Sequence, residues 1–552
     1  AKNRKEVRND SDLIFIGAAV EDLRGRKNVR AMEAGGMVMN ASVLQRRMIF
    51  MALALLLSVL LTSCGGGGGG LAGGGSGGTG VGPVSGFGSV IVNGVKFDDT
   101  GIDNTNFFDD RGRTKGDLKV GMVIRVTASS INIAGGTGVA TKIEVQRQAD
   151  GPADDNAVSL DNNSVKVLGQ TVFVDVGTVF DNVTDLVAID NLARSGKRPE
   201  LEIHGVTDDN GAIRASFVHR WSDDRVPGRE VQLKGTVTNL NTADNSFAIG
   251  RQRIVYTGFT APAANDYVEV GGIYRTSDNA VGVNRPINKE DPAAGQSPGD
   301  INAVEGYIDN VISSSPTGGS FRVLGPNGSQ IVNWAITIAF RDGDDADIQV
   351  GSKVEVYGTR KPDSSLAATR ISFRKPSDIL LVGQAFGKTA TSFFIFGVKV
   401  TVNASTSFRD SAGSNPPKTF GILDLSNGDT VKVTGFRDSS SLVTVIVATS
   451  VERIDPLSSP DRYILQGVVN TKTLASGQLD ILGLVVQTFV PNTEFLRADG
   501  TPFPGSGVAR QVNFFNAVTE GVTVVKARGT APLFSTNSMA ATEVEIEPVS
   551  TK

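Results

Sequence analysis

Two stretches of the chain read Gly351-Ser352-Lys353-Val354-Glu355-Val356-Tyr357-Gly358 and Gly428-Asp429-Thr430-Val431-Lys432-Val433-Thr434-Gly435. Both follow the pattern Gly-x-x-Val-x-Val-x-Gly, in which apolar and polar side chains alternate. A period of two places Val354 and Val356 on one face of a β-strand and Lys353 and Glu355 on the other. The pattern therefore predicts a strand that has one face in a core and one face in water.

This strand is the third element of a longer unit that recurs along the chain. Each unit opens with a Gly-x-Val-like strand, at Gly88, Gly235, Gly306, Gly383 and Gly467. An apolar strand then leads to a turn glycine, at Gly94, Gly169, Gly250, Gly325, Gly397 and Gly483, with spacings of 75, 81, 75, 72 and 86 residues. A strand rich in small residues usually closes the unit. The second unit lacks the opening glycine and the third lacks a clear closing strand, but the order predicts six tandem repeats.

Each repeat holds four or five strands, which is the size of a small closed barrel. Closure removes the exposed sheet edges that would invite aggregation. The order of short strands and glycine turns resembles a partly open, five-stranded OB-type barrel, and a series of small β-sandwiches is the alternative. We expect an all-β protein whose neighbouring repeats pack together. The expected links are Asp150-Gly151-Pro152, Pro286 to Pro298 and Pro456 to Pro460.

The motifs also resemble a bacterial family known as domain of unknown function 5666. The resemblance rests on the Gly-x-Val openings, the turn glycines and the strands at 351–358 and 428–435, and it spans nearly all of residues 81–548. It implies a repeat protein and brings no catalytic residue with it.

The only cysteine, Cys64, ends an apolar run that begins at Met48 and follows Arg46 and Arg47. A basic start, a short apolar stretch and a small-residue site form the layout of a secretory signal peptide. Leu61-Thr62-Ser63-Cys64 resembles the lipobox of bacterial lipoproteins, which implies that Cys64 is lipidated and that palmitate is attached. A transmembrane helix is the alternative, but the run is shorter than the roughly 20 residues that cross a bilayer.

Residues 65–80 contain 12 glycines, which is typical of a flexible tether. In enteric bacteria, an Asp directly after the lipidated cysteine favours retention in the inner membrane. Gly65 occupies this position here, so we expect the protein to be in the outer membrane. We expect residues 1–36 to be an upstream extension that is not translated, with a genuine N-terminal extension as the alternative. The predicted organisation is a signal peptide at 37–63, a tether at 64–82, and repeats at 83–148, 149–225, 226–290, 300–375, 378–455 and 460–550.

Charge and composition exclude several classes of function. Residues 1–63 hold 10 of the 54 Lys and Arg residues and 6 of the 58 Asp and Glu residues, so the chain after the leader has a net charge of −8. A mildly acidic chain lacks the electrostatic footprint of a nucleic-acid binder, so we expect no nucleic-acid partner. No cysteine remains for an internal disulfide, and no Cys-x-x-Cys-His or phosphate-binding glycine loop occurs, so we expect no cofactor.

Chemistry in the repeats depends on two histidines, His204 and His219, both on predicted strands of the second repeat. A Ser-His-Asp arrangement would need one of them, but no Gly-x-Ser-x-Gly elbow accompanies them. We therefore interpret both as strand histidines with hydrogen-bond partners and predict no catalytic residue.

Other polar and aromatic clusters have plain structural interpretations. The acidic runs at 342–347 and 153–156 lack the spacing of a calcium loop, so we interpret them as solvated loops and predict no metal site. Several aromatic residues could form stacking platforms on barrel faces, but we expect them in the core, which is their commoner position. They are Phe107, Phe108, Trp334, Phe393, Phe394, Phe514 and Phe515.

The leading hypothesis is a non-enzymatic, lipid-anchored protein of the cell envelope whose barrels form a binding or scaffolding surface. Lipidated Cys64 would contact the membrane, and an envelope protein or polysaccharide would be the further partner. One alternative is a carbohydrate- or oligonucleotide-binding module of OB type. The other is an envelope hydrolase centred on His204 and His219.

Overall fold

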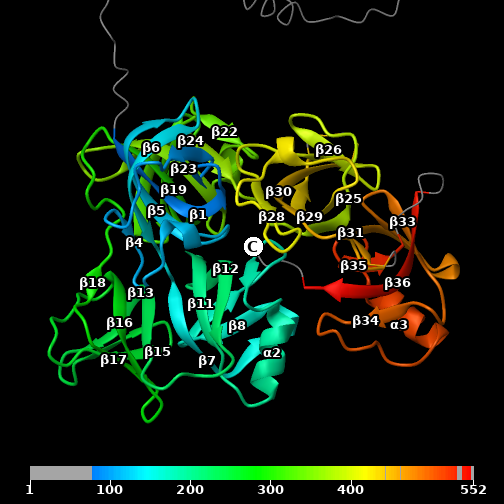
Figure 1. The fold of residues 1–552 in the computed structure, drawn as a ribbon, viewed down its shortest axis with the longest axis horizontal. Helices are drawn as coiled ribbons and strands as arrows, with labels where there is room; N and C mark the ends of the chain where they lie inside the picture. Colours follow the sequence, from blue (N-terminus) through cyan, green and yellow to red (C-terminus); the bar gives the residue numbers. More distant parts are fainter. Residues whose placement is uncertain (1–76, 440, 442, 460–461, 531–536, 549–552) are drawn as a thin grey trace, which may run out of the picture. The chain divides into compact units, whose positions relative to one another are not determined.

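The computed structural model describes residues 77–439, 441, 443–459, 462–530 and 537–548. These residues form 36 strands and two α-helices, so the prediction of an all-β protein is confirmed (Figure 1). The predicted extension 1–36, the leader and Cys64 lie outside the described residues. Within the described ranges, no helix combines the length and the apolar character needed to span a membrane.

The first repeat shows how the barrels close. It consists of β1 (Gly78–Gly86), β2 (Val90–Val92), β3 (Val95–Asp98), β4 (Phe107–Phe108), β5 (Val123–Asn132) and β6 (Thr137–Val145). Strand β1 pairs with β2 and β5, β2 pairs with β3, and β6 pairs with β5, all antiparallel. Strand β3 pairs with β6 in parallel, which completes a ring of five strands, and β4 adds a short parallel edge. The predicted OB-type barrel is therefore confirmed, and the β-sandwich alternative is wrong.

The other five repeats contain the corresponding strands. Repeat 2 holds β7 (Ala149–Ser159), β8 (Ser164–Val167), β9 (Gln170–Phe173), β10 (Val179–Asp181), β11 (Glu200–Thr207) and β12 (Ile213–Ser222). Repeat 3 holds β13 (Glu230–Asn241), β14 (Ser246–Ile249), β15 (Gln252–Val255), β16 (Tyr267–Arg275), β17 (Ala280–Val283) and β18 (Asn288–Lys289). Repeat 4 holds β19 (Ile301–Ser315), β20 (Gly318–Gly325), β21 (Gly328–Ala335), β22 (Ala339–Arg341), β23 (Lys353–Arg360) and β24 (Leu366–Phe373).

Repeats 5 and 6 complete the set. Repeat 5 holds β25 (Ile379–Gln384), β26 (Ser392–Ile395), β27 (Val398–Thr401), β28 (Ser407–Asp410), β29 (Thr430–Arg437) and β30 (Val445–Arg453). Repeat 6 holds β31 (Tyr463–Thr473), β32 (Gln478–Ile481), β33 (Leu484–Thr488), β34 (Glu494–Leu496), β35 (Val524–Gly529) and β36 (Ser538–Glu547).

Two α-helices, which we did not predict, lie between the third and fourth barrel strands of repeats 2 and 6. They are α2 (Leu186–Arg194) and α3 (Val508–Ala517). The Asp185 carboxylate caps α2 by accepting a hydrogen bond from the Ala188 backbone N–H at 2.8 Å. Helix α3 buries Phe514 and Phe515. Single turns of 3₁₀ helix occur at 115–117, 160–162, 345–347, 422–424 and 474–476.

The barrels are joined two by two through their first strands. Strand β1 pairs in parallel with β19, while β7 pairs with β13 and β25 pairs with β31 in antiparallel fashion. Repeats 1 and 4, 2 and 3, and 5 and 6 therefore each share one sheet of 12 strands. Only two of these three pairs are neighbours in sequence, and β1 and β19 lie side by side despite their separation in the chain (Figure 1).

The pairing follows from how an OB-type barrel uses its first strand. In β25, residues 380–382 pair with β29 inside the barrel and, on the opposite edge, with residues 464–466 of β31. Without β31 this second edge would present free N–H and C=O groups. The first strand is therefore the natural joint of the fold.

Shared sheets produce shared cores. One apolar cluster runs through repeats 5 and 6, where Leu381 and Leu465 are fully buried at the joint. A second cluster runs through repeats 2 and 3 and includes Ala149 and Leu233. The clusters of repeats 1 and 4 are separate, although Ala303 of repeat 4 belongs to that of repeat 1. Neighbouring repeats thus do pack together, and repeats 2 and 3 and repeats 5 and 6 do so by merging their cores.

Three local expectations are wrong. Asp150-Gly151-Pro152 is not a link, because it lies inside β7 and pairs with Glu200 to Glu202 of β11. The third repeat does have a closing strand, the short β17. The tether predicted for 64–82 ends earlier, because β1 begins at Gly78. Gly78 permits close packing of β1 against β19, since a Cβ on it would lie 1.9 Å from the Ile301 carbonyl oxygen.

The last glycine of the Gly-x-x-Val-x-Val-x-Gly motif sits at a β-bulge. The register between β29 and β30 shifts between Thr434 and Gly435, and that between β23 and β24 shifts between Tyr357 and Gly358. A Cβ on Gly435 would lie 2.3 Å from the Val447 carbonyl oxygen. The glycine is therefore required because the bulge brings two backbones together.

The polar face of this strand is not in water, contrary to our expectation. Glu355 is only 1% exposed and forms ion pairs with Arg374 and Arg370. Lys353 contacts Glu305 of β19 at 2.7 Å. The period of two holds, but ion pairs with side chains of the same repeat cover much of the outer face.

We expect Gly435→Ala to destabilise the sheet of repeats 5 and 6 by about 1–3 kcal/mol, because the added methyl group meets backbone that cannot rotate away. Scanning calorimetry measures the change. Gly101→Ala is the matched control, since nothing lies within 4 Å of a Cβ at that position. Equal transition temperatures for the two variants would contradict the role assigned to the bulge.

Candidate functional site

His204 lies on β11 and is fully buried. Its Nε2 is 2.7 Å from Glu202 Oε1, and its Nδ1 is 2.8 Å from the Gln146 carbonyl oxygen. Burial lowers the pKa of His204, and the hydrogen bond to Glu202 opposes this effect. Both ring nitrogens are engaged, so His204 is a structural residue at the centre of a polar cluster.

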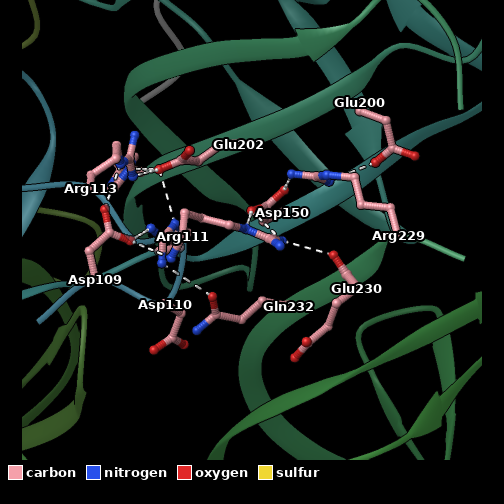
Figure 2. Close-up of polar contacts among 12 residues, drawn as sticks. Asp109, Asp110, Arg111, Arg113, Asp150, Glu200, Glu202, Arg229, Glu230 and Gln232 are labelled. Carbon is pink, nitrogen blue, oxygen red and sulfur yellow. Dashed lines mark hydrogen bonds and ion pairs between the residues drawn. The ribbon is translucent and has the colours of Figure 1, made fainter. Parts of the chain in front are cut away.

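Glu202 is the hub of that cluster (Figure 2). Arg147 Nε lies 3.0 Å from Glu202 Oε1, and Arg113 from repeat 1 also contacts this carboxylate. Arg147 and Arg113 both contact Asp109 of repeat 1. Burial alone would raise the pKa of Glu202, but His204 and the two arginines hold it well below its usual range. Glu202 is therefore an ionised carboxylate inside the protein.

A second hub, Asp150 on β7, continues the network (Figure 2). Its carboxylate contacts Arg111 of repeat 1 at 2.6 Å and Arg229 of repeat 3 at 2.7 Å. Arg229 also contacts Glu200 at 2.9 Å. Four arginines thus face four carboxylates where repeats 1, 2 and 3 meet. We name this set the arginine joint; its members are Asp109, Arg111, Arg113, Arg147, Asp150, Glu200, Glu202 and Arg229.

His219, on β12, lies outside the arginine joint and also has a structural partner. Its Nδ1 is 2.6 Å from Asp181 Oδ2, and Lys119 of repeat 1 contacts Asp181 Oδ1 at 2.7 Å. The ring meets Trp221 edge to face at 4.5 Å between centroids. The structure does not bring His204 and His219 together with a nucleophile in the way that a triad would require.

The acidic runs are local structure. Asp344 accepts a hydrogen bond from the Ala346 N–H and, with Asp347, caps a single 3₁₀ turn. Asp154 accepts from the Gly169 N–H at 3.1 Å. Within the described residues, no group of three or more His, Cys, Asp or Glu side chains is placed to hold a metal ion.

Most of the aromatic candidates belong to the core. Phe107, Trp334, Phe393, Phe514 and Phe515 are all buried. Phe108 is 48% exposed and Phe394 is 37% exposed, and an antiparallel bridge joins residue 394 to Phe386. They are isolated on separate repeats and do not form a continuous platform.

A cavity of about 1090 Å³ lies where repeats 1, 2, 4 and 5 approach one another. Its wall contains 13 Ser and Thr side chains and four Asn and Gln side chains. Six Lys and Arg residues and six Asp and Glu residues line it, so the formal charges cancel. It exceeds the usual 300–1,000 Å³ of ligand pockets only slightly.

Sequence reasoning missed this cavity and its residues. Tyr307 on β19, Asp378 before β25 and Lys432 on β29 all line it. Tyr307 and Lys432 occupy variable positions of the repeat motifs and Asp378 occupies a link, so their residue types alone do not mark them as a site. Only the meeting of four repeats gives these side chains a shared space.

We expect Asp150→Asn to lower the free energy of unfolding by about 3–5 kcal/mol, because two arginines would lose their shared counter-charge at a buried site. Asp278→Asn is the control, since Asp278 pairs with Arg275 at an exposed position and its loss should change the stability little. Urea denaturation monitored by circular dichroism compares the variants. Equal losses would contradict the role of the arginine joint.

A pH dependence follows from Asp181. Burial opposes its ionisation, but hydrogen bonds from His219 and Lys119 prevail and lower its pKa to about 2. The unfolded value is about 3.9, so the stabilisation by Asp181 is complete above pH 4 and is lost as the pH falls from about 4 to 2. We therefore expect the stability difference between wild type and Asp181→Asn to shrink across this window. A difference independent of pH would contradict the assignment.

Comparison with known protein families supports the tandem repeats. The family described as Domain of unknown function (DUF5666) matches residues 157–219, 305–372 and 384–452. These segments fall in repeats 2, 4 and 5, so the match includes the repeat that lacks the opening glycine. No curated protein matches the chain. Three repeats of the chain therefore match the family described as domain of unknown function (DUF5666).

Proposed function

We propose that this protein is a non-enzymatic, lipid-anchored protein of the bacterial cell envelope whose joined barrels form a binding and scaffolding surface. The observation that carries the proposal is that four repeats contribute polar side chains to one cavity. In the described part of the chain, both histidines form hydrogen bonds with acidic side chains of the protein.

The proposed location in the cell envelope rests on the predicted signal peptide. Arg46 and Arg47, the apolar run from Met48 and the lipobox-like Leu61-Thr62-Ser63-Cys64 together favour export and lipidation. Two or more acyl chains would hold the protein on a membrane, because a single chain binds only marginally. The glycine-rich residues after Cys64 would set the barrels away from the lipid surface.

The proposal of a non-enzymatic protein is supported by the hydrogen bonds of the two candidate histidines. A general base must reach a substrate proton within hydrogen-bond distance. His204 is fully buried and bonded at both nitrogens, so a substrate has no access to it. His219 is bonded to Asp181 and packed against Trp221. These contacts favour a binding protein over the envelope hydrolase.

We expect wild-type protein expressed in a bacterial host to incorporate radiolabelled palmitate and to fractionate with the outer membrane. Cys64→Ser should abolish labelling and release the protein from membranes, because the thiol is the acceptor of the lipid. Ser63→Ala keeps a small residue before the cysteine and should be labelled like wild type. Absence of label from the wild type would overturn the proposed anchor.

A further inference from the structure

Most of the Lys and Arg side chains in the wall of the cavity between repeats 1, 2, 4 and 5 form ion pairs with carboxylates. Arg374 contacts Glu355, Arg409 contacts Glu452, and Lys353 contacts Glu305. Six basic and six acidic residues line the space in all. A polyanion such as single-stranded nucleic acid requires a positive groove, which this wall does not offer.

Several polar groups on the wall remain unengaged. Within the described residues, the Tyr307 hydroxyl, the Asp378 carboxylate and the Lys432 ammonium group line the cavity and make no hydrogen bond or ion pair. Burial raises the pKa of Tyr307, so its hydroxyl remains a donor. Burial and the charge of Asp175 raise the pKa of Asp378, which is the expected effect when a carboxylate lacks a donor.

The remaining wall combines hydroxyl groups with half-buried aromatic rings. Ser377, Thr434, Thr449 and Ser450 form a chain of hydroxyl contacts of 2.7–2.9 Å along repeat 5. Phe173 and Phe436 line the same space, and the Arg214 guanidinium covers the Phe173 ring at 4.3 Å. Hydroxyl groups suit a ligand that offers many donors and acceptors, and the Phe436 ring suits the apolar face of a sugar.

We infer that this cavity binds an uncharged oligosaccharide, with the Tyr307 hydroxyl, the Asp378 carboxylate and the Lys432 ammonium group contacting its hydroxyls. The size of the cavity accommodates several sugar rings, and its balanced charge matches a neutral ligand. The inference rests on the proposed binding role and specifies its ligand class. It does not depend on the lipid anchor.

The test is isothermal titration of the full chain with chitotetraose and with maltotetraose in a detergent that contains no sugar. We expect at least one tetrasaccharide to bind. Tyr307→Phe should weaken it by about 3–10-fold, the value of one neutral hydrogen bond. Lys432→Ala should weaken it by about tenfold or more, because the lost bond involves a charge.

Matched controls separate the cavity from general effects. Tyr463→Phe and Lys399→Ala change the same residue types at positions outside the cavity wall and should bind like wild type. Circular dichroism confirms that each variant is folded. Failure of both tetrasaccharides to bind, or equal affinity in cavity and control variants, would overturn the inference.

Two further readouts keep the proposals apart. An oligothymidylate or heparin fragment that binds in place of the sugars would assign the cavity to a polyanion and also overturn the inference. Palmitate labelling and membrane fractionation report on the anchor alone. If the protein is labelled but binds no sugar, the proposed lipid anchor is supported and the cavity inference is overturned. If the protein binds sugar but is not labelled, the cavity inference is supported and the proposed anchor is overturned.

Discussion

The edge of each barrel's first strand is the constraint on which the structure depends. An OB-type ring closes around five strands but leaves half of the first strand with one free edge. In this chain each free edge pairs with the first strand of another barrel, in parallel for β1 and β19 and antiparallel for the other two pairs. The pairing satisfies the backbone groups and merges two of the three pairs into continuous cores. Small units that would bury little surface alone thereby gain a larger interior.

Polar contacts then join one pair of barrels to another. The arginine joint sets Arg111 and Arg113 of repeat 1 against Asp150 and Glu202 of repeat 2. Ionised groups tolerate burial only when they are paired, and each hub carboxylate here has two guanidinium partners. The same requirement accounts for His204, whose position next to Glu202 gives it structural rather than chemical work.

The cavity also results from the way in which the repeats assemble. Its polar lining comes from outer strand faces, loops and links of the four repeats. Because these residues belong to different repeats, no repeat forms the cavity alone. A ligand that requires Tyr307, Asp378 and Lys432 together would therefore report on the whole assembly. This is the physical sense in which a repeat protein without a repeated active residue can have one binding site.

The sequence by itself determined the repeat, the strand alternation and the closed barrel. These depend on local spacing, such as Val354 and Val356 on one face and a glycine wherever a bulge or turn brings backbones together. Helix α2 could have been predicted, since Asp185 is a good N-cap before an apolar pattern. The β-rich composition of the surrounding sequence favoured strands at this position. Only the tertiary structure decided that β1 pairs with β19, that Glu355 is buried, and that the cavity exists. The reason is that local pattern specifies which face of a strand is apolar, whereas the partner of a free edge or a polar face is chosen by residues far away in the chain.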